Sequence, residues 1–153
     1  MPARIVLAIF GSLGDLHPFL ALGLGLKARG HRVAFATHRY YREKIEAEGL
    51  DFFPVRPEAS PDDRELIAFA MDVKKGPERV LRDIVLPVLR ESYEDLLAAS
   101  HGADFLVSHP LTFAAPLIAE VLGLRWTSVV TTATLLASIS VDALTSAFAL
   151  PLL

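Results

Sequence analysis

Apolar runs alternate along the chain with segments of helical spacing. Strands are predicted where apolar and β-branched residues cluster, at residues 5–10, 32–37, 52–55, 104–108 and 126–131. The first run has six apolar residues in succession and is closed by Gly11, which is typical of a strand buried on both faces. Helices are predicted between these strands, at residues 18–29, 40–48, 61–75, 77–99 and 113–122. The alternation predicts the α/β fold class with a doubly wound parallel sheet.

Proline and glycine give the expected helix boundaries. Pro18 suits a first helical position, and Gly30 suits the position after a helix end. Gly23 and Gly25 lower the helix propensity of this segment, so we expect them to allow close approach to the sheet. Pro87 lies inside the long segment 77–99 and predicts a kink or a break there, because it lacks a backbone donor.

The last stretch, residues 133–153, is almost entirely apolar. Asp142 in its middle, a late Pro151 and the lack of a basic flank argue against a transmembrane span. We expect a helix that lines a binding cleft or packs on a further part of the protein. If its apolar surface is exposed, it favours self-association and leaves peripheral contact with a membrane open.

Length and composition restrict the class of protein. A chain of 153 residues is expected to form one domain. Its net charge of -3, with scattered Lys and Arg, argues against a nucleic-acid partner. The sequence contains no cysteine, which excludes disulfides and thiolate chemistry and fits a reducing compartment. No signal sequence is recognisable at the N-terminus, so a cytoplasmic location is expected.

Several well-known motifs are missing from the sequence. The spacing of Gly11 and Gly14 is not that of a dinucleotide fold, there is no Gly-Lys-Ser/Thr phosphate loop, and Ser12 is not in a G-x-S-x-G elbow. The five histidines lack metal-ligand spacing, so no metal site and no tightly bound cofactor are predicted.

Polar residues follow four of the predicted strands. Because the carboxyl ends of parallel strands meet at one edge of a sheet, these side chains are expected to share that edge. The residues concerned are Ser12, Asp15 and His17 after the first strand, Thr37 and His38 after the second, Ser108 and His109 after the fourth, and Thr131 and Thr132 at the fifth. The histidines at positions 31, 38 and 101 are expected to face solvent.

Two segments near the N-terminus carry a family resemblance. They are residues 11–22, GSLGDLHPFLAL, and residues 26–33, LKARGHRV. Together they resemble the opening of nucleotide-sugar-dependent glycosyltransferases with the GT-B fold. The branch concerned is the family 1/28-like one that includes sterol glucosyltransferases and the transferases that glycosylate macrolide and glycopeptide antibiotics. The match is specific over about the first fifty residues, through residue 52; beyond them only the order of elements is similar.

The resemblance implies a Rossmann-like, acceptor-binding N-terminal half of a two-domain enzyme. A second domain, not found in residues 1–153, would hold most of the nucleotide-diphosphate sugar, such as UDP-glucose. The piece alone is therefore expected to be inactive. The acceptor would be a small lipophilic molecule, sterol-like or a natural-product aglycone, and transfer of the hexose would be a single inverting displacement without metal.

The resemblance also implies a role for Asp15. In the family the proposed general base follows the second glycine and precedes x-x-Pro, which is the place of Asp15 between Gly14 and Pro18. A positioned carboxylate can accept the proton of an attacking hydroxyl and contributes about 10²–10⁴-fold. Substrate contacts are assigned to the surrounding polar residues, which are Ser12, Gly14, His17, His109, Thr131 and Thr132.

Each of these residues also has a purely structural interpretation. Asp15 could satisfy free N–H groups at a helix start, and Ser12 and Gly14 could only shape the turn. His17 could be a turn residue or could orient Asp15 or the acceptor. His109 could be a hydrogen-bonded residue at the sheet edge, and Thr131 and Thr132 could simply end a strand.

Two other classes of function remain open on the sequence. One is a flavodoxin-like module that binds a mononucleotide or flavin. The other is a non-enzymatic α/β domain used for interaction. The glycosyltransferase hypothesis differs from both because it requires the native protein to continue into a second Rossmann-like domain.

Overall fold

The computed structural model describes residues 1–58, 63, 64, 68 and 76–131. The predicted helix 61–75 and the apolar segment 133–153 therefore lie largely or wholly outside the described residues. The described part contains one sheet whose five parallel strands are arranged in the order β3-β2-β1-β4-β5. The strands are β1 (Arg4–Ala8), β2 (Arg32–Thr37), β3 (Asp51–Pro54), β4 (Phe105–Ser108) and β5 (Arg125–Ser128).

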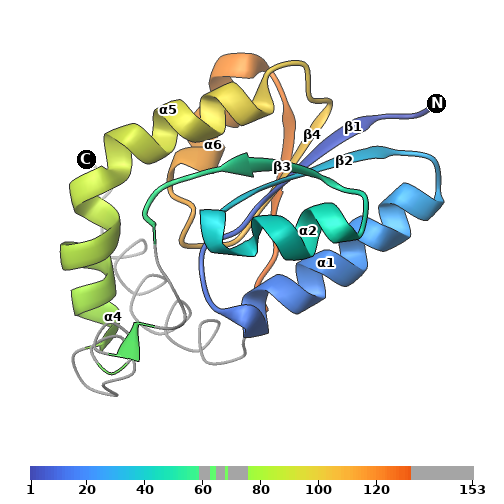
Figure 1. The fold of residues 1–153 in the computed structure, drawn as a ribbon. Coiled ribbons are helices and arrows are strands. Elements are labelled where there is room, and N and C mark those ends of the chain that lie inside the picture. The colour runs from blue at the N-terminus through green and yellow to red at the C-terminus, as the bar shows by residue number, and fades with distance from the viewer. Residues whose placement is uncertain (59–62, 65–67, 69–75, 132–153) are drawn as a thin grey trace.

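Helices cover both faces of the sheet, as the doubly wound prediction requires (Figure 1). The longer helices are α1 (Leu13–Ala28), α2 (Arg42–Ala47), α5 (Leu89–Ser100) and α6 (Ala114–Leu122). Leu7 and Ile9 face the side of α1 and α2, where they pack with Phe19 and Ile45. Val6 and Ala8 point to the opposite side, toward α5 and α6. The apolar run that starts the chain thus forms the central strand, buried on both faces.

The first helix begins earlier than predicted. It starts at Leu13 and not at Pro18, and Pro18 lies inside it. The reason is a capping box: the Ser12 side chain accepts from the Gly14 N–H, and the Asp15 side chain accepts from the Ser12 N–H. This local hydrogen bonding at Ser12 fixes the start of the helix one and a half turns before the proline.

The other boundaries agree closely with the predictions. Gly30, Gly49 and Gly123 end helical segments with φ values of 86°, 66° and 65°. The long segment 77–99 is interrupted around Pro87, as predicted. It consists of a short α4 (Gly76–Arg79), π-helical turns over Val80–Val85, a 3-10 turn over Leu86–Val88 and then α5. A further 3-10 turn, Arg39–Tyr41, precedes α2.

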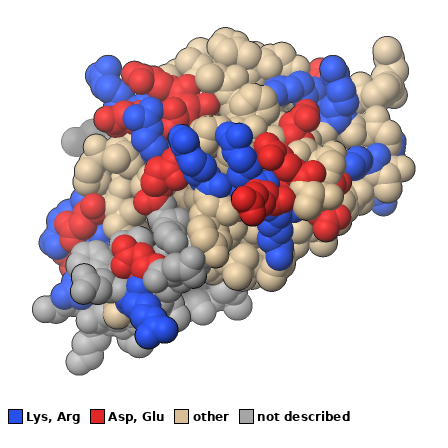
Figure 2. Space-filling model, viewed as in Figure 1, with Lys and Arg blue, Asp and Glu red and all other residues tan. Residues whose placement is uncertain are grey.

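Acidic and basic side chains are intermixed on the surface. Figure 2 shows blue and red groups side by side over the face in view, without a broad area of one sign. Within the described ranges, no helix is long and apolar enough to cross a membrane.

Candidate functional site

The turn between β1 and α1 holds the Asp15 carboxylate in one orientation. Oδ2 of Asp15 accepts the Ser12 N–H at 3.0 Å, and the Ser12 hydroxyl accepts the Gly14 N–H at 3.2 Å. This orientation of Asp15 requires a glycine at position 11 for two reasons. Its φ of 142° disfavours other residues, and a Cβ at this position would overlap Oδ2 of Asp15. The glycine-rich turn therefore serves to place a carboxylate at the carboxyl edge of the sheet.

The second oxygen of Asp15 meets residues from two distant segments. Thr131, three residues after β5, donates a hydrogen bond from Oγ1 to Oδ1 of Asp15 at 2.6 Å. His109, directly after β4, brings Nε2 to 3.6 Å from the same oxygen. The Asp15 side chain remains 17% exposed, so it is accessible from the sheet edge. The structure thus brings together three of the predicted site residues.

Burial keeps the His109 imidazole neutral. His109 is only 3% exposed, and loss of solvent lowers its pKa from the ordinary 6.5, while the nearby Asp15 carboxylate opposes that change. The Leu111 N–H donates to Nδ1 of His109 at 3.3 Å. Since a backbone N–H can only donate, Nδ1 carries no proton, and the proton of the neutral ring is on Nε2. The N–H of His109 therefore faces the Asp15 carboxylate.

The remaining predicted site residues do not meet at Oδ1 of Asp15. Ser12 and Gly14 belong to the helix cap, as their structural interpretation requires. His17 is exposed on α1, and its side chain makes no hydrogen bond or ion pair within the part of the chain that the structure describes. Thr132 lies outside the described residues.

His38 contradicts the prediction that it faces solvent. It is 2% exposed, and its Nδ1 donates to the Pro57 carbonyl oxygen. The Phe10 ring packs edge-on against it, with 5.3 Å between centroids. Burial lowers the pKa of His38, which the Pro57 carbonyl and the Glu58 charge partly offset. The other two histidines differ: His31 is half-buried and accepts from the Ala3 N–H, and His101 is exposed, as predicted.

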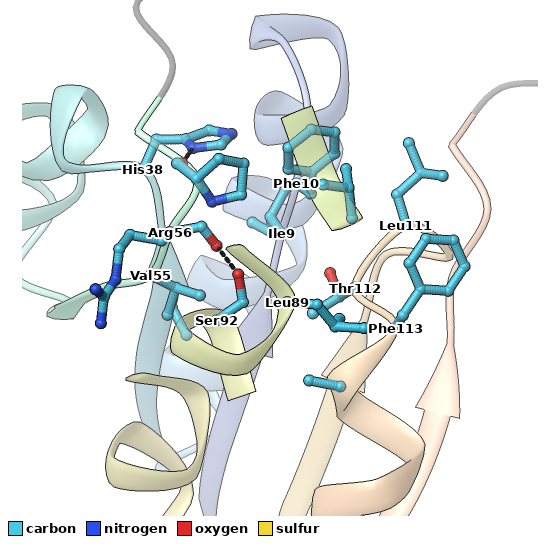
Figure 3. A pocket seen from close by; sticks show the side chains of 14 residues that line it. Ile9, Phe10, His38, Val55, Arg56, Leu89, Ser92, Leu111, Thr112 and Phe113 are labelled. Carbon is cyan, nitrogen blue, oxygen red and sulfur yellow. Dashed lines mark hydrogen bonds between the residues drawn. The ribbon is translucent and has the colours of Figure 1, made fainter. Parts of the chain in front are cut away.

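An apolar cavity lies at the same edge of the sheet, on the side of α5 and α6. Figure 3 shows Phe10, Leu111 and Phe113 around it, with Leu89 and Ser92 contributed by α5. Its enclosed volume is about 30 Å³, which is room for little more than a water molecule. No pattern in the sequence had indicated the α5 residues. Leu111 and Phe113 could have been suspected, because they follow His109 in the same loop.

The described residues contain no cluster of three or more His, Asp or Glu side chains that could hold a metal ion. The polar groups of the site are instead one carboxylate, one imidazole and one hydroxyl. This set can orient and deprotonate a hydroxyl group, and it resembles no phosphate-binding loop.

A five-stranded parallel sheet with helices on both faces and a polar site at its carboxyl edge defines a Rossmann-like α/β domain. The sequence matches the family described as "Glycosyltransferase family 28 N-terminal domain" over residues 5–139, and the chain belongs to this family. The resemblance inferred from residues 11–33 is thereby confirmed.

Individual relatives agree with this assignment. The chain is 36% identical over 128 residues to UDP-sugar-dependent glycosyltransferase 52 of Dictyostelium discoideum, covering 79% of this chain and 7% of that protein. It is 32% identical over 130 residues to a sterol 3-beta-glucosyltransferase of Candida albicans, covering 80% of this chain and 8% of the relative. The chain spans less than a tenth of the length of either relative.

Solved structures show the same fold. The spinosyn forosaminyltransferase SpnP superposes with a TM-score of 0.67 at 19% identity, over 97% of this chain and 36% of that one. The predicted Rossmann-like architecture, matching the N-terminal half of GT-B glycosyltransferases, is confirmed.

Proposed function

We propose that this chain is the acceptor-binding portion of an inverting glycosyltransferase. The reaction moves a hexose from a nucleotide-diphosphate sugar to a hydroxyl group of a lipophilic acceptor, sterol-like or a natural-product aglycone. The family assignment supports this proposal, as do relatives named for UDP-sugar dependence and for sterol glucosylation. The observation that carries it is the Asp15 carboxylate, held at the carboxyl edge of the sheet with Oδ1 turned to other polar groups.

Asp15 acts as the general base in this proposal. The acceptor oxygen forms a bond to the anomeric carbon while the bond from that carbon to the diphosphate oxygen breaks, and the nucleoside diphosphate leaves. The acceptor proton passes to Oδ1 of Asp15. A single displacement of this kind inverts the anomeric configuration, and it requires neither a covalent intermediate nor a metal. A positioned base contributes about 10²–10⁴-fold.

The apolar surroundings suit a lipophilic acceptor. Phe113 is 40% exposed at the mouth of the cavity, on the loop that also carries Leu111. A cavity of about 30 Å³ cannot take a whole acceptor, since ligand pockets usually measure about 300–1,000 Å³. The acceptor body therefore lies over this edge, with contacts assigned to Ser12, Gly14, His17, Thr131 and Thr132.

The proposal also covers the sugar donor, the second domain and the location of the protein. A second domain following these residues holds most of the nucleotide sugar, as UDP-glucose or a similar donor, so residues 1–153 alone transfer no sugar. No cofactor is tightly bound. The cysteine-free sequence suits a cytoplasmic protein. Contact with a membrane surface would be peripheral and would serve access to a lipophilic acceptor.

Substitution of Asp15 in the full-length protein tests the role of the carboxylate. With UDP-glucose as donor and ergosterol or a macrolide aglycone as acceptor probe, Asp15→Asn should lower kcat by about 10²–10⁴-fold. The asparagine retains an oxygen that can accept the Ser12 N–H, so the helix cap and the fold should be kept, which circular dichroism checks. The matched control is Asp51→Asn, which changes an exposed carboxylate at the opposite edge of the sheet.

The anomeric configuration of the product shows whether the reaction inverts. NMR of the glycoside should show the β-anomer from the α-linked donor. Near-normal turnover by Asp15→Asn, or an α-glycoside product, would contradict the proposed mechanism.

A further inference from the structure

Two ionisable side chains face each other at the site, and either could in principle accept a proton from a substrate. They are Asp15, at the start of α1, and His109, after β4, with 3.6 Å between Oδ1 and Nε2. General-base catalysis needs a group that has a free lone pair and lies within reach of the substrate. The hydrogen bonds and the exposure of the two side chains distinguish them.

Neither ring nitrogen of His109 is free to accept a proton. The lone pair of Nδ1 accepts the Leu111 N–H at 3.3 Å, and Nε2 carries the proton of the neutral ring. Protonation at Nδ1 would set two N–H groups against each other in a buried place, which is costly. With only 3% of its surface exposed, His109 also offers little access to an acceptor hydroxyl. The burial of His109 lowers its pKa and so also disfavours the uptake of a proton.

We infer that His109 is a positioning residue, whose imidazole stays neutral and protonated at Nε2 and presents that N–H to the Asp15 carboxylate. The inference rests on the proposed function for its catalytic consequence. The distance of 3.6 Å is longer than a hydrogen bond, so the interaction is one between a charge and a dipole. It holds Oδ1 toward the place where a hydroxyl would bind.

Backbone hydrogen bonds fix His109 in this role. The His109 N–H donates to the Ala8 carbonyl at 2.8 Å, and the Thr112 N–H donates to the His109 carbonyl at 2.9 Å. Ala8 ends β1, and the Asp15 turn follows it after a few residues. Both partners are therefore tied to the carboxyl end of the central strand. Among the residues that the structure describes, Asp15 is the charged group that faces the imidazole.

Two substitutions test whether His109 acts as a fixed hydrogen-bond donor or as a group that carries a proton. His109→Gln places an amide N–H near the former position of Nε2 and does not titrate, whereas His109→Leu has a similar size and no donor. In the full-length protein, assayed with UDP-glucose and ergosterol or the macrolide aglycone, His109→Gln should retain kcat within about threefold. His109→Leu should lower kcat by about tenfold with a smaller effect on the acceptor KM.

The melting temperature gives a second measurement. A purely structural role of His109 would lower the melting temperature and the activity of both variants alike. Equal loss of activity in both variants would overturn the inference.

The tautomer can be measured without any turnover. NMR of the histidine ring nitrogens, with the His109 signals assigned from their loss in His109→Gln, should show a neutral ring protonated at Nε2 near pH 7. A ring protonated at Nδ1, or a charged ring, would overturn the inference even if the enzyme is active. If Asp15→Asn instead proves fully active while the Nε2 tautomer is observed, the proposed general base fails and the assignment of the His109 proton stands.

Discussion

The Thr131 hydroxyl donates a 2.6 Å hydrogen bond to Oδ1 of Asp15, across 116 positions in the sequence. This bond links the segment after β5 to the first turn of α1. It also uses one lone pair of the oxygen to which we assign the acceptor proton. The other lone pair remains for a substrate hydroxyl, so Thr131 determines how the carboxylate is turned when the acceptor arrives.

Removal of the Thr131 hydroxyl should therefore weaken catalysis. Thr131→Val keeps the branched shape and removes the donor, and kcat/KM should fall by about tenfold, the usual effect of losing a hydrogen bond to a charged group. Thr131→Ser keeps a hydroxyl and should stay close to the wild type. The measurement is the initial rate over a range of acceptor concentrations. An increase of kcat/KM in Thr131→Val would mean that the hydroxyl competes with the acceptor for Oδ1.

The sequence was sufficient for the architecture because the strands are strong local signals. Five apolar runs separated by helical segments left few alternatives to a parallel sheet, and Gly30, Gly49 and Gly123 marked helix ends correctly. The start of α1 was predicted wrongly because Pro18 suggested a first helical position. The capping box of Ser12 and Asp15 was the stronger signal, and the spacing of a serine followed three residues later by a carboxylate could have shown it.

The geometry of the site was much less predictable. The shared sheet edge of Asp15, His109 and Thr131 followed from parallel strands, but the distances between them depend on how loops after three different strands fold back. The burial of His38 depends on the Pro57 carbonyl and the Phe10 ring, which come from other segments. Such contacts leave no local pattern in the sequence.

The two glycines inside α1 give a test of how closely this helix lies on the sheet. A Cβ at Gly23 would come within 2.8 Å of the Phe35 ring and 3.2 Å of a Leu7 methyl group. Both neighbours are fully buried, so neither can move away easily. Gly23→Ala should therefore lower the free energy of unfolding by about 1–3 kcal/mol.

Gly25 is the matched control for this substitution. A Cβ there would meet nothing within 4 Å, so the expected close approach applies to Gly23 and not to Gly25. Gly25→Ala should raise the free energy of unfolding by about 0.5–1 kcal/mol through better helix propensity. Urea unfolding of both variants measures the difference. Equal destabilisation by the two substitutions would show that the helix is not packed against Phe35 in this way.

Acidification should destabilise the fold through its buried histidines. The pKa of His38 in the folded protein is lowered from 6.5, chiefly by burial, so the unfolded chain takes up a proton more readily than the folded one. The contribution of His38 to stability is then complete above about pH 6.5, and it declines as the pH falls from there toward the lower pKa of the folded state. His109 acts in the same direction, because its pKa is lowered by burial as well.

Substitution of His38 isolates its share of this effect. His38→Asn can still donate to the Pro57 carbonyl but cannot titrate, so the free energy of unfolding should depend less steeply on pH below about 6.5. His101→Asn, at an exposed position, is the control for replacing a histidine by asparagine. Urea unfolding at several pH values between about 5 and 8 gives the slopes. If His38→Asn shows the wild-type slope, protonation of His38 does not drive the loss of stability, and His109 becomes the residue to substitute next.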